Sequence, residues 1–327
     1  MQSVGTSLTP DSQVELHFEE PFTWRQFFAR FPDEHSCRQY LARLRWPAGF
    51  HCSNCGSEKG WRLSDGLWSC SGCARKVSVT AGTVFDRSRV PLTNWFAAAW
   101  LMAIRSHGVS ALALQGRLGL GSYQTAWTML RKLRWAMAQS GQSKLQGVVE
   151  VGKAFLAGRQ TIKKGRDEED EHFVAIAAEA HFLQGVGMVR LKRIDDLSSR
   201  SLGSFVERVV EGGSEVRTIP GVDHLEMDSG HEHRVVFPFD NGFREQIALP
   251  GIRFVAVQLK RWLAKTPKGS INAQLLDLYL DEFTLRFNCR GPRSNERLFS
   301  AILEACVHST PSRFRPTRAR PLLRKSC

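Results

Sequence analysis

The chain has 327 residues, 42% of them hydrophobic and 24% charged, with a formal net charge of +13 and a pI near 9.7. This length allows two or three domains, each with its own core. No apolar run approaches the ~18 residues that span a bilayer, and the first residues lack the pattern of a secretory signal. We therefore expect a soluble, intracellular protein without a membrane partner. The basic charge favours nucleic acid as the partner.

The N-terminal region is predicted to consist of a flexible segment over residues 1–20 and short helices over residues 21–49. The stretch TWRQFFARF has apolar residues at helical spacing. Asp33 is a suitable N-cap for a second helix that continues through CRQYLARLRW, and Pro47 ends this helix.

Residues 50–80 contain two C-x2-C pairs separated by fourteen residues. The four thiolates of such pairs converge on one point, and around a tetrahedral Zn²⁺ they form a closed structural site. The stretch WRLSDGLWSC between the pairs is typical of a β-hairpin that turns at Asp65-Gly66. We predict a zinc ribbon in which zinc supplies folding energy but has no open position for catalysis. Its ligands would be Cys52, Cys55, Cys70 and Cys73.

The other cysteines are scattered, which does not fit the disulfide framework of a small secreted domain. They instead fit a reducing compartment.

Residues 92–139 are predicted to be helical. An apolar helix ends at Gly108, a second begins after Ser110 as N-cap, and LGLGS makes a turn before a third helix near Tyr123. Helices joined by a short glycine-containing turn are typical of a helix-turn-helix, although many such hairpins bind nothing. The last helix carries polar and basic side chains that could face a DNA groove, namely Gln124, Thr125, Arg131, Lys132 and Arg134.

Beyond the polar linker SGQSKLQG, the patterns predict an α/β unit with a mixed sheet. Strands are expected at VVEV, over 172–180, over 185–194 and over 214–219, with a helix at about 198–211. The charged run KKGRDEEDEH is interpreted as a solvated turn. Two amphipathic helices, QLKRWLAK and AQLLDLYLDEFTLRFNCR, follow the last strand.

Residues 291–327 are expected to form a basic, proline-containing tail. From Arg286 to Cys327 there are ten Arg or Lys against two Glu, and three prolines lie near the end. This composition is typical of an extended, mobile segment. It is either a solvated chain end or an arm that lies on DNA phosphates.

Several of these stretches, in this order, resemble one family: bacterial insertion-sequence transposases of the ISXO-like group, with an N-terminal zinc ribbon and a ribonuclease-H-like catalytic domain. The likeness extends from about residue 22 to residue 290. It is carried by FPDEHSCRQYLARLRWPAGFHCSNCGS, TAGTVFDRSRVPLTNWF, GVSALALQGRLGLGSYQTAWTMLRKLRWAM, and LKRWL followed by LLDLYLDEFTLRFNCR. The resemblance implies a multidomain α+β protein, with an α/β ribonuclease-H-like domain over residues 145–290 that contains a mixed sheet.

The resemblance also implies where active members hold a catalytic pair of Mg²⁺ ions, which need oxygen ligands. The first carboxylate position of the family is occupied here by Gly152, followed by Lys153, and the second by Ile219. The third, an Asn in the family, is Gln258, while Lys260 is retained. Because the first two positions have lost their carboxylates and the third is also changed, we predict the transposase fold without a working catalytic site.

The sequence also offers two alternative sites. Glu150 lies on the same strand face as Gly152, so a shifted metal site that uses Glu150 and Asp223 is conceivable. The alternative is that Glu150 is an ordinary strand residue and Asp223 part of a turn. The histidines His224, His231 and His233 are interpreted as a surface loop rather than a second zinc site.

The expected function is to bind the inverted repeats at the DNA ends of an insertion sequence, as a catalytically degenerate transposase-family protein. A DNA-binding regulator repurposed from a transposase, an active transposase and the product of a decayed gene are the alternatives. The resemblance implies a bacterial, cytoplasmic and nucleoid-associated protein that can form homo-oligomers.

Overall fold

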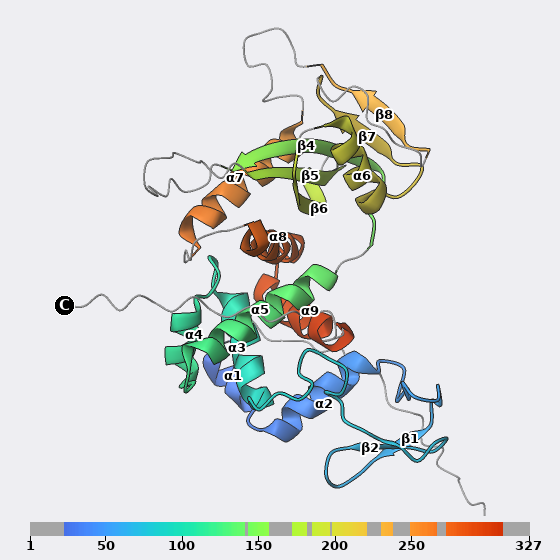
Figure 1. The fold of residues 1–327 in the computed structure, drawn as a ribbon, viewed down its shortest axis with the longest axis vertical. Helices are drawn as coiled ribbons and strands as arrows, with labels where there is room; N and C mark the ends of the chain where they lie inside the picture. The colour runs from blue at the N-terminus through green and yellow to red at the C-terminus, as the bar shows by residue number, and fades with distance from the viewer. Residues whose placement is uncertain are drawn as a thin grey trace, which may run out of the picture.

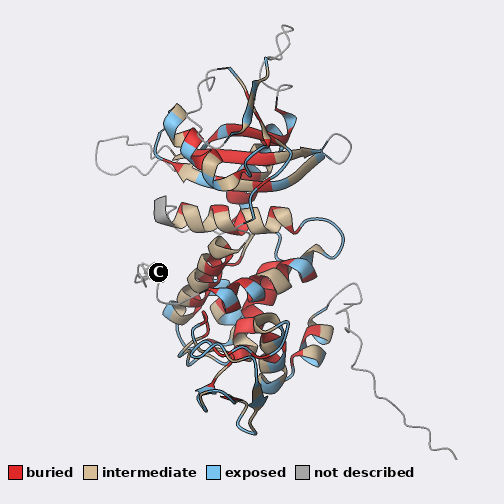
Figure 2. Ribbon diagram, turned by 90° about the vertical axis from the view of Figure 1, so that its right-hand side faces the viewer, coloured by how far each residue is buried: buried red, intermediate tan, exposed pale blue. Residues whose placement is uncertain are grey.

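The structure of the chain is a computed structural model. It describes residues 23–140, 143–156, 172–181, 185–196, 198–220, 230–237, 249–266 and 273–309. These residues form a helical lobe, which carries a small three-stranded sheet at one end, and a second lobe built on a five-stranded sheet (Figure 1). Buried residues concentrate in the centre of the large sheet and on the facing sides of the helices (Figure 2).

Helices from both ends of the described chain build the helical lobe. They are α1 (Trp24–Arg30), α2 (Glu34–Arg45), α3 (Leu92–Ile104), α4 (Ala111–Leu118), α5 (Tyr123–Gln139) and α9 (Ser294–His308). One continuous core of buried side chains joins these helices. Phe27 of α1 stacks on Trp100 of α3 with ring centroids 5.8 Å apart, and Phe299 of α9 lies edge-on to Trp100, also at 5.8 Å.

Helix α9 corrects the prediction of an extended tail over residues 291–327. Leu298, Phe299, Ile302 and Leu303 are buried in the core of the helical lobe. The prediction rested on the basic charge of the segment and overlooked the apolar residues, whose spacing of i, i+1, i+4 and i+5 is that of an amphipathic helix. The prolines that suggested an extended arm lie outside the described residues.

The small sheet has the predicted hairpin. Its strands are β1 (Gly60–Arg62), β2 (Trp68–Cys70) and β3 (Lys76–Val77), paired antiparallel in the order β1-β2-β3. The turn between β1 and β2 closes with a hydrogen bond of 2.8 Å from the Leu63 N–H to the Leu67 carbonyl. Gly66 has φ +83°, which the predicted Asp-Gly turn requires.

The large sheet contains the predicted strands and one that the sequence patterns did not indicate. Its strands are β4 (Val148–Leu156), β5 (His172–His181), β6 (Gly185–Ile194), β7 (Glu215–Thr218) and β8 (Glu232–Val235). The order is β6-β5-β4-β7-β8. The pairs among β4, β5 and β6 are antiparallel, whereas β4–β7 and β7–β8 are parallel. The sheet is therefore mixed, as expected.

Helices cover both faces of this sheet. They are α6 (Ser199–Val209), α7 (Pro250–Lys265) and α8 (Ala273–Asn288). Val149 and Val151 of β4 pack with α6, while Ala154 packs with α7 and α8 on the other face. Even-numbered residues of β4 therefore point to α7, because successive side chains of a strand alternate. Helix α8 lies between the lobes, against β6 on one side and α5 on the other (Figure 1).

Candidate functional site

The four predicted zinc ligands come together. The sulfur atoms of Cys52, Cys55, Cys70 and Cys73 all lie within 4.8 Å of one another. The closest pairs are Cys52 with Cys73 at 3.8 Å and Cys55 with Cys70 at 3.5 Å. Zn–S bonds of about 2.3 Å place the sulfurs of a tetrahedral site roughly 3.8 Å apart, so this cluster fits a zinc ion.

Each cysteine pair lies in a similar turn, which aims its sulfur atoms inward. The Gly56 N–H donates to the Cys52 carbonyl at 2.9 Å, and the Ala74 N–H donates to the Cys70 carbonyl at 3.0 Å. Both Gly56 and Ala74 follow the second cysteine of their pair and have positive φ. Although desolvation opposes it, hydrogen bonds from backbone N–H groups lower the pKa of Cys70 to about 6. The turn thus favours the thiolate form that binds metal.

Helix α4 has the predicted N-cap, and α5 is capped by a serine in the same way. The Ser110 hydroxyl accepts from the Ala113 N–H at 3.1 Å, and the Ser122 hydroxyl accepts from the Thr125 N–H at 3.1 Å. Gly119 ends α4 in the left-handed conformation with φ +60°. This capping fixes where the short turn between the helices begins and ends.

The predicted DNA-contacting residues of α5 differ in accessibility. Gln124 is exposed, and Thr125 is half-buried beside the N-cap. The Arg131 guanidinium lies over the Trp127 ring, 4.7 Å from its centroid, and Lys132 donates to the Val84 carbonyl at 3.3 Å. Burial lowers the pKa of Lys132. The N-terminal end of α5 is therefore the part most open to a groove.

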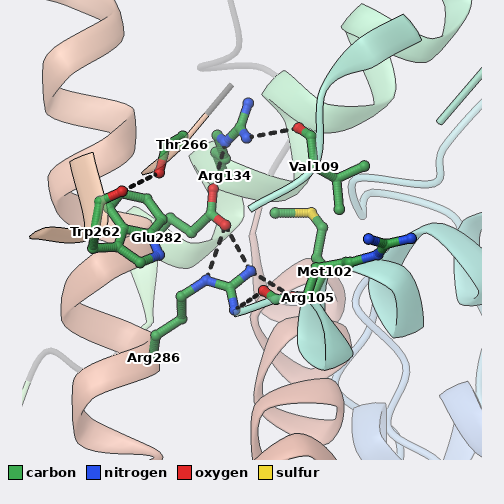
Figure 3. A network of polar contacts seen from close by, with 8 residues as sticks. All are labelled: Met102, Arg105, Val109, Arg134, Trp262, Thr266, Glu282 and Arg286. Carbon is green, nitrogen blue, oxygen red and sulfur yellow. Dashed lines mark hydrogen bonds and ion pairs between the residues drawn. The ribbon is translucent and has the colours of Figure 1, made fainter. Parts of the chain in front are cut away.

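Arg134 is not available to DNA, so this part of the prediction is wrong. Its Nε donates to Glu282 of α8 at 2.6 Å, and its Nη2 donates to the Val109 carbonyl at 3.3 Å. Glu282 is fully buried and also accepts from Arg286 Nε at 3.0 Å and Nη2 at 2.7 Å (Figure 3). Sequence reasoning missed this because the carboxylate partner of Arg134, Glu282, lies 148 residues further along the chain.

Arg286 extends the same network to α3. Its guanidinium donates to the carbonyls of Met102 and Arg105 at the end of that helix (Figure 3). The Met102 carbonyl lies in the last turn of α3, where carbonyls lack an intrahelical donor, so the arginine satisfies it. The Arg105 carbonyl also accepts from the Gly108 N–H at 3.4 Å. The network joins the helical lobe to α8 and thereby to the large sheet.

Gly152, which occupies the first carboxylate position of the family, faces an apolar side chain. A Cβ added to Gly152 would lie 2.8 Å from Cγ2 of Ile252 on α7, closer than side chains normally approach. Ile252 therefore fills the space in which a side chain at 152 would stand. Local sequence patterns contain no signal for this contact, because Ile252 lies a hundred residues further along the chain.

Lys153 does not point into the same space. It is exposed, and it pairs with Ala175 on the face that α6 covers, opposite to Gly152. Because neighbouring strand residues point to opposite faces, the Lys153 charge lies on the other side of the sheet from the space beside Gly152.

Glu150 makes a structural hydrogen bond to the start of α7. Its carboxylate is 5% exposed and accepts from the Ile252 N–H at 3.1 Å in the first turn of α7. Helix α7 has no cap from its own N-cap side chain, and Glu150 replaces it from the neighbouring strand. Burial raises the pKa of Glu150, while the N–H groups of Ile252 and Gly251 oppose the shift.

The second family position lies beside the first, because the parallel β4–β7 register, Glu150 with Arg217, continued by two residues places Ile219 next to Gly152. Ile219 follows β7 and packs against the core on the α7 side of the sheet. Gln258 lies half-buried on α7, six residues after Ile252, which is about 9 Å along the helix axis and roughly 240° around it. Lys260 is exposed. The three nearest atoms to an added Cβ at Gly152 all belong to Ile252, and none belongs to Gln258.

The alternative sites gain no support within the described residues. Asp223 and His224 lie outside them. His233 is on β8 and its Nε2 lies 2.8 Å from the hydroxyl of Thr218. In the part of the chain that the structure describes, the four cysteines are the one group of three or more metal-ligating side chains brought together.

A mixed five-stranded sheet covered by helices, preceded by a zinc ribbon, defines a ribonuclease-H-like transposase fold. Comparison with protein families matches residues 32–76 to the transposase zinc-ribbon domain and residues 144–288 to the ISXO2-like transposase domain. The chain therefore carries a transposase zinc ribbon followed by an ISXO2-like transposase domain.

A curated relative is described as an uncharacterized protein in transposable element ISH50 of Halobacterium salinarum. The two are 29% identical over 144 residues, which is 42% of this chain and 48% of the relative. The chain thus spans about half the length of the relative that it matches. None of the helices in the described ranges has the length and apolar character that crossing a membrane requires.

Proposed function

We infer that the protein binds the DNA ends of an insertion sequence and holds them without cutting them. The transposase family of the chain, its zinc ribbon and its net charge of +13 support DNA as the partner. The exposed N-terminal end of α5, with Gln124 and Thr125, offers polar groups to a groove. Arg131 and Lys132 lie half-buried one to two turns further along the same helix.

The packing of Ile252 against Gly152 carries the second half of the proposal. The chemistry of the positions does not fit a Mg²⁺ pair, since Gly152 and Ile219 have no side-chain oxygen and Gln258 has only an amide. Besides lacking donors, the first position is closed by a packed isoleucine. Glu150, the nearest carboxylate on the same strand face, caps α7 instead.

Binding and cleavage are tested separately on the full chain. Labelled duplexes that carry the element's inverted repeats are titrated by fluorescence anisotropy, with scrambled duplexes as the control. We expect preference for the repeats and an affinity that falls steeply between about 50 and 200 mM salt. Equal affinity for both duplexes would refute specific recognition of the element ends.

The same duplexes are then incubated with Mg²⁺ or Mn²⁺ and analysed for nicks. We expect none, and metal-dependent nicking at the repeat ends would show an active transposase instead.

A repurposed DNA-binding regulator is the second candidate, and the same closed position at Gly152 favours it equally. A transposase-derived end binder has to bring two ends together, so it should self-associate on DNA, whereas a regulator can occupy a single site. Analytical ultracentrifugation of the protein with one repeat duplex separates them. Complexes that contain two duplexes support the end binder, and complexes with one duplex support the regulator.

A further inference from the structure

A cleft lies between α2 and the zinc ribbon, and no role described above uses it. It has a volume of about 330 Å³. Its lining combines three arginines with three aromatic residues, namely Arg38, Arg43, Arg62, Trp46, Phe50 and Trp68. No Asp or Glu is found among the described residues that line it. The cleft is therefore positively charged around an apolar floor.

The floor and walls of the cleft are held in place by packing. Phe50 stacks on Trp68 with ring centroids 5.4 Å apart and an interplanar angle of 7°, and Trp46 lies edge-on to both rings. Arg45 of α2 donates to the carbonyls of Ser78 and Val79 at 3.1 and 2.7 Å. These bonds tie the helix to the segment that leaves the ribbon, so the cleft is a built feature of the fold.

One of the arginines is positioned by a histidine. Arg62 Nη2 lies 3.1 Å from His35 Nδ1. A guanidinium can only donate, so Nδ1 is the acceptor in this contact. The Nε2 of the same ring lies 2.9 Å from the side-chain amide of Gln39. His35 thereby fixes Arg62 of the ribbon against α2 at the edge of the cleft.

The carboxylates near the cleft are already used by the backbone. Asp33 accepts from the Ser36 N–H at 2.8 Å, Glu34 from the Thr93 N–H at 3.0 Å, and Asp65 from the Leu67 N–H at 2.9 Å. Among the described residues, none of them forms an ion pair with an arginine of the cleft. The guanidinium groups thus remain available to an external anion.

We propose that this cleft is a subsite for a DNA strand. The guanidinium groups of Arg38, Arg43 and Arg62 contact neighbouring phosphates, and the half-buried rings of Trp46 and Trp68 contact the sugar or base between them. A basic groove with aromatic side chains is the arrangement that nucleic-acid strands favour. The inference rests on the proposed DNA binding and adds a contact surface on α2 and the zinc ribbon.

The test compares two triple variants of the full chain that lose the same charge. One replaces Arg38, Arg43 and Arg62 by Ala. The control replaces three exposed arginines on other elements by Ala, namely Arg25, Arg234 and Arg297. Both are titrated with one labelled DNA duplex over a range of salt concentrations. Each lost phosphate contact reduces the slope of log K against log[salt] by about 1. We expect a reduction of about 3 for the cleft variant and little change for the control.

Zinc content and circular dichroism show whether the cleft variant is folded. Arg43→Ala serves as a second variant, since this exposed side chain has no hydrogen bond or ion pair among the described residues, and its slope should fall by about 1. Equal slopes for the wild type and folded cleft variants would overturn the subsite while leaving DNA binding intact. Equal losses in the cleft and control variants would also overturn it, because they would indicate general charge attraction. A wild type that binds no DNA would refute both proposals.

Discussion

Glu282→Gln tests the buried network that joins the two lobes. The Glu282 carboxylate is 0% exposed, and it faces Arg134 and Arg286, whose side chains are 9% and 11% exposed. A glutamine supplies one oxygen where the carboxylate supplies two, and its NH₂ group would face a guanidinium. One arginine is then left with an unpaired charge in the interior.

The expected loss follows from this burial. Removing one partner of a buried ion pair costs roughly 3–5 kcal/mol, whereas surface substitutions cost about 0.5 kcal/mol or less. At roughly 2–4 °C per kcal/mol, Glu282→Gln should lower the melting temperature by about 6–20 °C. Glu304→Gln on the exposed side of α9 is the matched control. Urea denaturation and thermal melts at neutral pH measure both variants.

The pH dependence provides an independent check. Although burial opposes it, Arg134 and Arg286 lower the pKa of Glu282. A lowered pKa stabilises the fold above the unfolded value of about 4.3, and the contribution is lost as pH falls through the folded value. The difference between wild type and Glu282→Gln should therefore shrink at acid pH. A loss at neutral pH no larger than that of Glu304→Gln would refute the reasoning.

Four further predictions concern the zinc site, the closed position on β4, the buried Glu150 and the half-buried Asp281. Cys52→Ser should release zinc and unfold the ribbon, and unchanged zinc by metal analysis would contradict this. Gly152→Asp alone should lower the free energy of unfolding, measured by urea denaturation, by about 1–3 kcal/mol through overpacking. Adding Ile252→Ala should recover part of this loss. A loss that Ile252→Ala leaves unchanged would show that another contact is responsible. Glu150→Ala should lower stability by about 1 kcal/mol, measured by thermal melts, because α7 loses its cap. Glu150→Gln keeps an acceptor and should lower stability less. Equal losses for the two variants would argue against capping. Burial and the neighbouring Asp277 raise the pKa of Asp281 to about 7, so its protonated form is favoured and stability is lost as pH rises through 7. Asp281→Asn should therefore raise the melting temperature above pH 7 and change it little near pH 4, and a uniform shift at all pH values would contradict this.

The closed position at Gly152 also changes what a restored active site would need. The substitutions Gly152→Asp, Ile219→Asp and Gln258→Asn would return the family's oxygen donors. They would not make room for the first one, because Ile252 occupies the space beside β4. We therefore expect a restored enzyme to require a smaller residue at 252 as well, and metal-dependent nicking by the triple variant alone would contradict this.

Local patterns in the sequence were sufficient for the zinc ribbon and for most secondary structure. The spacing of Cys52, Cys55, Cys70 and Cys73 specifies a metal site because short turns bring each pair together whatever surrounds them. Strand alternation and capping residues such as Ser110 act over a few residues, so the strands β4 to β7 and the start of α4 could be predicted. The short strand β8 lacks an apolar face, and its parallel pairing with β7 is a tertiary contact.

The tertiary structure decided what depends on partners far away in the chain. Arg134 has the same sequence signature as a DNA-binding arginine, and only the position of Glu282 on α8 makes it a buried one. In the sequence Glu150 resembles a metal ligand, but in the structure the N-terminus of α7 lies beside it and donates a hydrogen bond to its carboxylate. The sequence determines which side chains can carry a charge, whereas their solvation and their counter-ions depend on the folded interior.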